Sequence, residues 1–248
     1  MKAIVLAAGY ATRLYPLTKD RPKPLLRVGE KTILDYLLDG FNQLSDLDSV
    51  YVVSNAKFAP IFREWSDIVN ESNRHAFEVE VLDDGSTDNE TRLGAIADVR
   101  FAIEQKKIDD DCIVAAGDNI FRFDFKQLHV DFQKNNADTI VVQEIKDKER
   151  LRQRGVVSFD DTRKITLFEE KPDKPRSTFV CPALYMHKKS TLPLYKTFLT
   201  VNDQADAPGH FISWLYQQVP VYAFIMATPA LDIGTLSVYE KIQKQFSI

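Results

Sequence analysis

The sequence predicts an α/β fold in which a mixed central sheet is flanked by helices. In the first half of the chain, short apolar runs alternate with segments whose apolar residues recur at helical spacing. This pattern is typical of a parallel sheet covered by helices. After residue 138 the strand-like runs follow one another across short turns, which indicates antiparallel or mixed pairing. With 44% hydrophobic and 27% charged residues, the 248-residue chain can bury a substantial core.

The first half contains four predicted strands and three predicted helices. Each strand is a short run of apolar or alternating residues, and each helix carries apolar residues on one face. A polar loop, DDGSTDNETR, precedes the third helix. The predicted strands are residues 3–7, 49–54, 77–82 and 112–116, and the predicted helices are residues 32–44, 57–68 and about 93–106.

The second half is expected to add strands to the same sheet. Strand-like runs cover residues 138–145, 155–159, 164–170, 179–187 and 221–226, and helical patterns cover 191–199, 209–218 and 235–246. No repeat or low-complexity linker separates these segments. We therefore expect residues 1–248 to form one domain with two halves, about 1–137 and 138–248.

Composition narrows the class of protein. The net charge of −4 argues against nucleic acid as the main partner. No apolar run approaches the length of a membrane span, and the run that opens the chain is too short for a secretory leader. Cys112 and Cys181 are far apart, show no metal-binding spacing and lie in apolar runs, so buried free thiols are expected. These features indicate a cytoplasmic protein without a membrane partner.

The chemistry is expected beyond the carboxyl ends of the strands, where open α/β sheets bind ligands. Polar residues follow strand ends at 9–23, 83–94, 117–119 and 232–235. The first of these places opens a basic loop: residues 9–27 hold five Lys or Arg against one acid, and three prolines stiffen them. Small residues at the strand end let an anion approach the backbone. The loop matches neither a Walker A motif nor a dinucleotide fingerprint, so it predicts a polyphosphate site of another kind.

Two aspartates are candidates for a metal site. Asp118 follows the strand 112–116, and Asp232 precedes the last helix. Polyphosphate chemistry needs a divalent cation, and Mg²⁺ prefers one or two carboxylates completed by substrate oxygens and water. Either residue could instead cap a helix or hold a turn. We expect the two carboxylates to converge on one Mg²⁺. Lys171, in the segment EEKP, could hold a second anion, although on spacing alone an ordinary strand-end lysine is favoured.

Several motifs resemble one family. The stretch MKAIVLAAGYATRLYPLTKDRPKPLL closely resembles the signature LAAGxGTRLxPxTxxxPKPL of sugar-1-phosphate nucleotidyltransferases, such as glucose-1-phosphate thymidylyltransferases and uridylyltransferases. The later segments GDN (117–119), GVV (155–157), EEKP (169–172) and DIGT (232–235) follow in the family's order. The resemblance implies a Rossmann-like nucleotidyltransferase fold with NTP and a sugar 1-phosphate as partners. Residues 1–137 would bind the NTP and residues 138–248 the sugar phosphate.

The resemblance also implies roles for individual residues. Arg13, Lys23 and Asp118 would be catalytic, and Asp118 and Asp232 would bind Mg²⁺. The expected nucleotide-binding residues are Leu6, Ala8, Gly9, Thr12, Arg13, Lys23 and Gly94, and the expected sugar-phosphate-binding residues are Asn119, Gly155, Glu170, Lys171 and Tyr185.

Three departures from the family pattern bear on the substrates. Ala11 replaces the second glycine of the loop, the glutamine-containing base loop is replaced by LDDGSTDNETRLGAI, and a glycine is missing before Tyr185. In the replaced loop, Asp83 or Asp84 could accept a hydrogen bond from a base N–H, and we expect UTP or dTTP to be preferred.

Three questions stay open at this point. A cytidylyltransferase for phosphocholine, with an aromatic cage from Tyr185, Trp214 and Tyr216, is one alternative to a sugar-phosphate enzyme. A catalytically silent nucleotide-sugar-binding regulatory subunit is another. A homo-oligomer is also compatible with the sequence.

Overall fold

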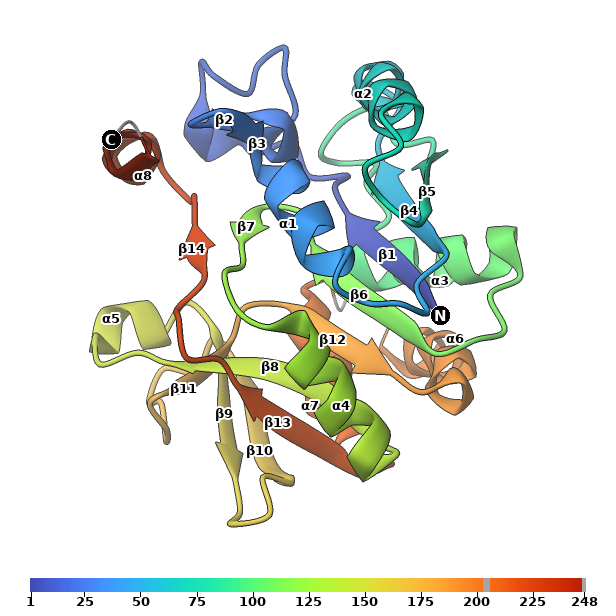
Figure 1. Cartoon of the computed structure of the whole chain (residues 1–248). Helices are drawn as coiled ribbons and strands as arrows, with labels where there is room; N and C mark the ends of the chain where they lie inside the picture. The colour runs from blue at the N-terminus through green and yellow to red at the C-terminus, as the bar shows by residue number, and fades with distance from the viewer. Residues whose placement is uncertain (203–205, 247–248) are drawn as a thin grey trace.

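The structure is a computed structural model that describes residues 1–202 and 206–246 (Figure 1). Its centre is a mixed sheet of ten strands, which confirms the predicted fold class. The strands are β1 (Lys2–Leu6), β2 (Arg27–Val28), β3 (Lys31–Thr32), β4 (Ser49–Ser54), β5 (Glu78–Asp83), β6 (Cys112–Ala116), β7 (Asn119–Ile120), β8 (Asp138–Glu144), β9 (Gly155–Phe159), β10 (Ile165–Glu170), β11 (Phe179–Cys181), β12 (Leu184–His187), β13 (Val221–Ile225) and β14 (Leu231–Asp232). The helices are α1 (Ile33–Phe41), α2 (Ala59–Glu71), α3 (Ala95–Lys106), α4 (Phe125–Asn135), α5 (Lys148–Leu151), α6 (Leu192–Val201), α7 (Pro208–Leu215) and α8 (Leu236–Phe246).

The large sheet contains strands from both halves of the chain. Its order is β10-β9-β11-β8-β12-β6-β1-β4-β5, with β13 paired to β8. The strands β6, β1, β4 and β5 are parallel to one another, whereas β12 runs antiparallel to both β6 and β8. The two halves are therefore joined edge to edge by β12. β7 and β14 form a separate two-stranded ladder.

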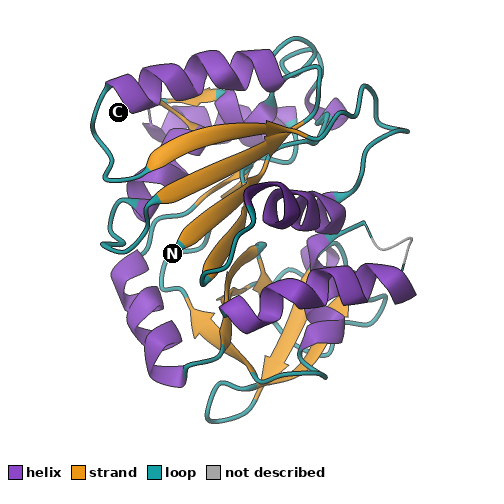
Figure 2. Cartoon of the chain, turned by 90° about the vertical axis from the view of Figure 1, so that its right-hand side faces the viewer, coloured by secondary structure: helices purple, strands orange, loops and turns teal. Residues whose placement is uncertain are grey.

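Alternating side chains of the central strands are buried on both faces, because helices cover each face (Figure 2). Ala3 and Val5 of β1 pack in a cluster with residues of α1, α2 and α4. Ile4, between them, packs in a second cluster with residues of α3, α6 and α7. The near-continuous apolar runs of the sequence are explained by this double coverage.

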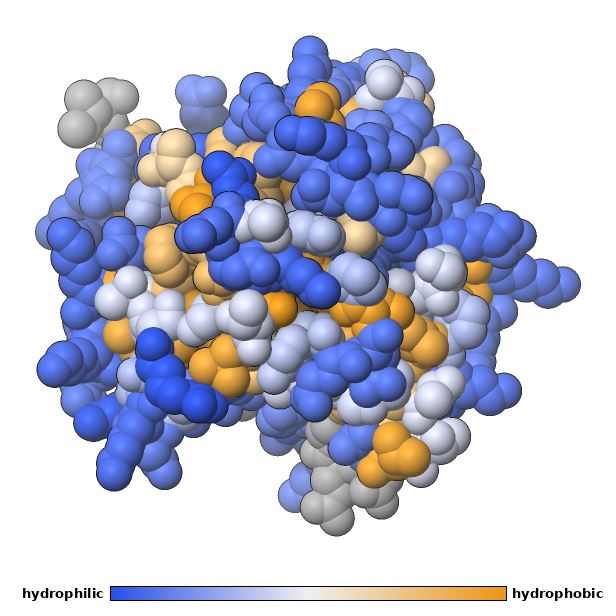
Figure 3. All heavy atoms as spheres, turned by 90° about the horizontal axis from the view of Figure 1, so that it is seen from below, coloured by the Kyte–Doolittle hydropathy of each residue, from blue (hydrophilic) through white to orange (hydrophobic). Residues whose placement is uncertain are grey.

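The surface carries no concentrated apolar face in the view from below, where small apolar patches lie among hydrophilic atoms (Figure 3). The most exposed large apolar side chains of the described residues, Ile68, Val130 and Val201, come from three different helices. Among the described helices, none combines the length and the apolar character that a membrane span requires. Cys112 and Cys181 are buried free thiols, as predicted.

Two predictions of secondary structure differ from the structure: one predicted strand is divided in two, and a helix of 11 residues was not predicted. The run 179–187 is two strands, because the chain leaves extended geometry at Ala183, whose φ is 52°. β11 then pairs with β8 and β9, whereas β12 pairs with β6 and β8. Helix α4 was not predicted. Asp124 caps it by accepting backbone hydrogen bonds from Lys126 and Gln127, and this aspartate before an apolar stripe is the signal that could have found it.

Candidate active site

A cavity of about 1080 Å³ opens where the two halves of the chain meet. Its wall comes from the end of β1, the loop that follows it, the end of β6, the segment after α5, the end of β10, and β14 with α8. The cavity therefore lies beyond the carboxyl ends of the central parallel strands, at the edge where α/β folds bind ligands.

The basic loop after β1 is fixed by its own packing. Leu14 and Leu26 are buried and anchor the loop to a small apolar cluster. Thr18 donates a hydrogen bond through its hydroxyl to the carbonyl of Ala11 at 2.8 Å. Lys23 begins a 3₁₀ turn between two prolines and is only 7% exposed. The loop thus holds a lysine ammonium inside the cavity.

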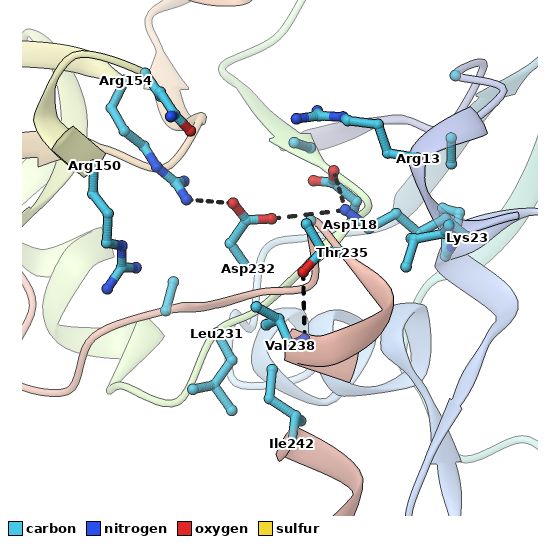
Figure 4. A pocket seen from close by; sticks show the side chains of 18 of the residues that line it. Arg13, Lys23, Asp118, Arg150, Arg154, Leu231, Asp232, Thr235, Val238 and Ile242 are labelled. Carbon is cyan, nitrogen blue, oxygen red and sulfur yellow. Dashed lines mark hydrogen bonds and ion pairs between the residues drawn. The ribbon is translucent and has the colours of Figure 1, made fainter. Parts of the chain in front are cut away.

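At the centre of the cavity, Lys23 joins the two predicted carboxylates. Its Nζ lies 2.7 Å from Asp118 Oδ2 and 3.7 Å from Asp232 Oδ1 (Figure 4). On the other side, the Arg154 guanidinium donates a hydrogen bond to Asp232 Oδ2. Figure 4 shows Arg13 on the Lys23 side of the pair and Arg154 on the opposite side. Cations from both halves of the chain thus surround two acids.

The small β7–β14 ladder explains why these acids meet although 113 positions separate them in sequence. Asp118 follows β6 and directly precedes β7, and Asp232 lies in β14 opposite Asn119 of β7. The Asn119 side-chain amide donates to Asp118 Oδ1 at 2.9 Å and orients that carboxylate. Two backbone pairings therefore place Asp232 beside Asp118.

The comparisons with known proteins show the family of this chain. The family model described as nucleotidyl transferase matches residues 2–247. The chain belongs to this family. A Sulfolobus acidocaldarius protein, provisionally assigned as a mannose-1-phosphate guanyltransferase, is 33% identical over 77% of this chain. The match covers 50% of that protein, so this chain spans about half its length.

Two other relatives extend the comparison. A Neisseria gonorrhoeae glucose-1-phosphate thymidylyltransferase is 31% identical over 79% of this chain and 64% of its own length. A solved Bacillus anthracis structure, titled as a provisional glucose-1-phosphate thymidylyltransferase in complex with a sucrose, superposes with a TM-score of 0.82. It is 22% identical and the match covers 100% of this chain and 96% of that one, which shows the nucleotidyl transferase fold.

The donor set at the centre fits a hard divalent cation. Within residues 1–202 and 206–246, no group of three or more His, Cys, Asp or Glu side chains is placed to hold a metal ion. Asp118 and Asp232 are nevertheless two carboxylates that contact one ammonium nitrogen, with side chains 40% and 24% exposed. Two carboxylates with open access match the coordination of Mg²⁺, which takes its remaining ligands from phosphates and water.

The structure brings half of the residues expected from the family motifs to the cavity wall. Tyr185 lies farthest from what was expected: it is 2% exposed in the core, and burial raises the pKa of its hydroxyl well above the usual value. A direct contact between Tyr185 and an acceptor is therefore not supported. The cavity is lined by Leu6, Gly9, Arg13, Lys23, Asp118, Lys171 and Asp232, whereas Ala8, Thr12, Gly94, Asn119, Gly155, Glu170 and Tyr185 lie outside its lining.

Glu170 lies outside the cavity lining, next to the lining residue Lys171. A Cβ added at Gly209 would lie 1.9 Å from Glu170 Oε2, and one added at Gly155 would lie 3.1 Å from the same atom. The carboxylate is thus packed tightly between two glycines, and burial raises the pKa of Glu170. Lys171 follows with a φ of 49° and points an exposed ammonium 3.9 Å from that carboxylate.

The loop 83–94 holds its acids in turns. Asp83 accepts a hydrogen bond from the backbone of Gly85 at 2.9 Å, and Asp84 accepts two from Ser86 at 2.7 and 2.6 Å. Neither aspartate lines the cavity. Burial, together with the carboxylate of Asp84, raises the pKa of Asp98 to about 8. Asp83 and Asp84 thus stabilise the turns of the loop itself.

The sequence reasoning missed a set of arginines on the opposite wall. Arg150, Arg152 and Arg154 all line the cavity. The signal was present in the segment KDKERLRQRG, in which every second residue from 146 to 154 is basic. No phosphate-binding motif has this spacing, so the pattern alone did not indicate a site.

Proposed function

We propose that this chain is an enzyme that joins an NTP to a sugar 1-phosphate and releases pyrophosphate, forming an NDP-sugar. Membership of the nucleotidyl transferase family supports the reaction class. The observation that carries the proposal is the central arrangement, in which Lys23 bridges Asp118 and Asp232 inside a cavity with cations on both sides. We also propose that both halves act within one domain, residues 1–137 on the NTP and 138–248 on the acceptor.

The reaction needs alignment and charge neutralisation rather than a covalent intermediate. An oxygen of the acceptor phosphate attacks the α-phosphorus in line, and the bond from that phosphorus to the bridging oxygen of pyrophosphate breaks. Negative charge moves toward the pyrophosphate, where Arg13 and Lys23 would stabilise it. Lys171, at the end of β10, would anchor the acceptor phosphate. The two anions would thus be held by different elements.

Asp118 and Asp232 are the residues that would hold Mg²⁺. When bound, the ion would supply positive charge that offsets the negative charge developing on the phosphates during transfer. The chain's own contribution is to hold both carboxylates in place, through the β7–β14 ladder and through the Asn119 amide.

The two alternative functions receive less support from the site. A phosphocholine headgroup is cationic, whereas the acceptor side of the cavity is lined by arginines and Lys171. Neither Trp214 nor Tyr216 lines the cavity, and both pack against the core. A silent regulatory subunit would not need the complete set of central charges that this cavity retains.

We propose that UTP or dTTP is preferred as the nucleotide. The base-binding segment would be the loop 83–94, which joins the end of β5 to α3. The measurement is pyrophosphate release with ATP, GTP, CTP, UTP and dTTP, each combined with several sugar 1-phosphates. Comparable rates with purine nucleotides would contradict the preference, and no release from any pair would contradict the enzyme itself.

Lys171→Ala tests the division between the two anions. Because Lys171 comes from a different strand end than the basic loop, its loss should raise KM for the acceptor several-fold more than KM for the NTP. Lys174→Ala, an exposed lysine of the following turn outside the cavity lining, serves as the matched control. Equal changes in both KM values would argue against the assignment.

A further inference from the structure

The acceptor side of the cavity carries more positive charge than one phosphate group requires. We define this acceptor cluster as Arg150, Arg152, Arg154, Lys171 and Lys241, all of which line the cavity. They come from α5 and the turn after it, from the residue that follows β10, and from α8. Of the described residues that line the cavity, only Asp118 and Asp232 are acidic. The five positive charges of the cluster therefore outnumber the two carboxylates of the cavity wall.

Three members of the cluster already have partners or a role. Arg154 binds Asp232, and Arg152 pairs with Glu149 at 2.9 Å. Lys171 is the anchor proposed above for the acceptor phosphate. Its backbone N–H donates to the carbonyl of Arg154 at 3.0 Å, so the turn after α5 and the anchor lie side by side.

Arg150 differs from these three. Its guanidinium makes no hydrogen bond or ion pair with any residue in 1–202 or 206–246. Figure 4 shows it beside Arg154, on the side of the cavity away from Arg13 and Lys23. Its backbone N–H is held by the Asp147 carboxylate at 3.3 Å, which fixes the short helix that presents it. A fixed helix thus offers an unpaired guanidinium to the cavity.

We propose that the acceptor carries a second acidic group, a carboxylate or a phosphate, in addition to its phosphate ester, and that Arg150 binds this group. The inference rests on the proposed function. A guanidinium matches carboxylate and phosphate oxygens in a two-point fork, which a hydroxyl cannot satisfy equally well. A neutral hexose 1-phosphate supplies one anionic group, and Lys171 suffices for it. Acidic sugar phosphates supply the second.

The test compares acceptors that differ only in the second group. Glucuronic acid 1-phosphate and glucose 1,6-bisphosphate are each compared with glucose 1-phosphate, using pyrophosphate release with the preferred NTP. We expect kcat/KM to be at least about 10-fold higher for one or both acidic acceptors, the scale of one charge-assisted contact. The comparison between the two acidic acceptors shows whether a carboxylate or a second phosphate is recognised.

Variants then assign the preference to Arg150. Arg150→Ala should bring the ratio of the two kcat/KM values close to one, and Arg150→Lys should retain part of it. Lys148→Ala, on the same helix but outside the cavity lining, should leave the ratio unchanged. Titration calorimetry with glucuronic acid 1-phosphate and with glucose 1,6-bisphosphate gives a readout without turnover, and Arg150→Ala should weaken binding of the preferred acidic acceptor about 10-fold.

The outcomes separate this inference from the proposed function. Equal or faster reaction of glucose 1-phosphate would overturn the inference and leave the enzyme in place. A uniform loss for all acceptors in Arg150→Ala would also overturn it, because a general electrostatic effect does not discriminate. Absence of pyrophosphate release from every pair of NTP and acceptor would instead overturn the proposed function.

Discussion

The buried ammonium of Lys23 is the central group whose removal has the most specific consequence. Its side chain is 9% exposed and lies 2.7 and 3.7 Å from the two carboxylates. Lys23→Met removes the charge and keeps most of the volume. In the metal-free protein, Asp118 and Asp232 would then face each other, and Arg154 would be the one cation among the described residues still paired with either of them.

The magnitude follows from the burial of the three groups. Removing one partner of a fully buried ion pair costs roughly 3–5 kcal/mol. The carboxylates here are 40% and 24% exposed, and water screens part of their repulsion. We therefore expect a loss of about 1–3 kcal/mol in the free energy of unfolding. For a chain of this size, each kcal/mol lowers Tm by roughly 2–4 °C.

The assay is thermal unfolding in EDTA, in Mg²⁺, and in Mg²⁺ with NTP. In Lys23→Met, Mg²⁺ alone should recover most of the lost Tm, because the ion replaces the missing positive charge between the carboxylates. In the unmodified protein, the ammonium already lies there, so Mg²⁺ should raise Tm mainly when NTP is also present. Lys19→Met, an exposed lysine of the same loop, is the control.

Activity gives the second readout for the same variant. Lys23→Met should lower kcat/KM for pyrophosphate release by roughly 10²–10³, the scale of one preorganised electrostatic contact. A variant that is as stable as the unmodified protein in EDTA would refute the structural reasoning. Turnover near the unmodified level would refute the catalytic assignment.

Three further predictions concern the carboxylates and the loop. Asp118→Asn or Asp232→Asn should nearly abolish pyrophosphate release while circular dichroism shows an intact fold, and substantial residual activity would remove that residue from the site. The raised pKa of Asp98, about 8 in the folded protein, means that stability is lost as pH rises from about 4 through 8. Asp98→Asn should therefore gain stability over the unmodified protein by roughly 2–5 kcal/mol between pH 5 and 9 in denaturant titrations, and a pH-independent difference would contradict the shift. Ala11 has a φ of 48°, so Ala11→Gly should keep or raise the free energy of unfolding, whereas Ala11→Val should lower it by about 1–2 kcal/mol. An equally stable Val variant in thermal unfolding would show that the loop can relax.

Much of the fold could be predicted because buried strands leave a strong local signal. The runs 49–54 and 112–116 coincide with β4 and β6 residue for residue. Both are covered by helices on two faces, so nearly every residue in them is apolar. The break between β11 and β12 was missed although Pro182 marks it, because the residues on both sides of Pro182 form one apolar run.

The site was predicted less completely, for a different physical reason. Asp118 follows the end of β6 and Lys23 lies in the loop after β1, and the motifs that contain them could be identified. The β7–β14 ladder, which places Asp232 beside Asp118, consists of two residues on each strand. A run of two residues is too short to show the alternating hydrophobic pattern of a strand. The contact of Arg154 with Asp232 also depends on tertiary packing alone. Neither could be inferred from spacing.

The charges of the free site suggest an order of binding. Lys23 and Arg154 neutralise the two carboxylates from opposite sides, and each cation comes from a different half of the chain. Phosphate groups of the two substrates offer these cations new partners, and the carboxylates then become available to a divalent ion. We therefore expect the metal to bind together with the NTP rather than ahead of it. A Mg²⁺ affinity in calorimetry that is unchanged by NTP would contradict this coupling, because competition with Lys23 requires that the two ligands bind cooperatively.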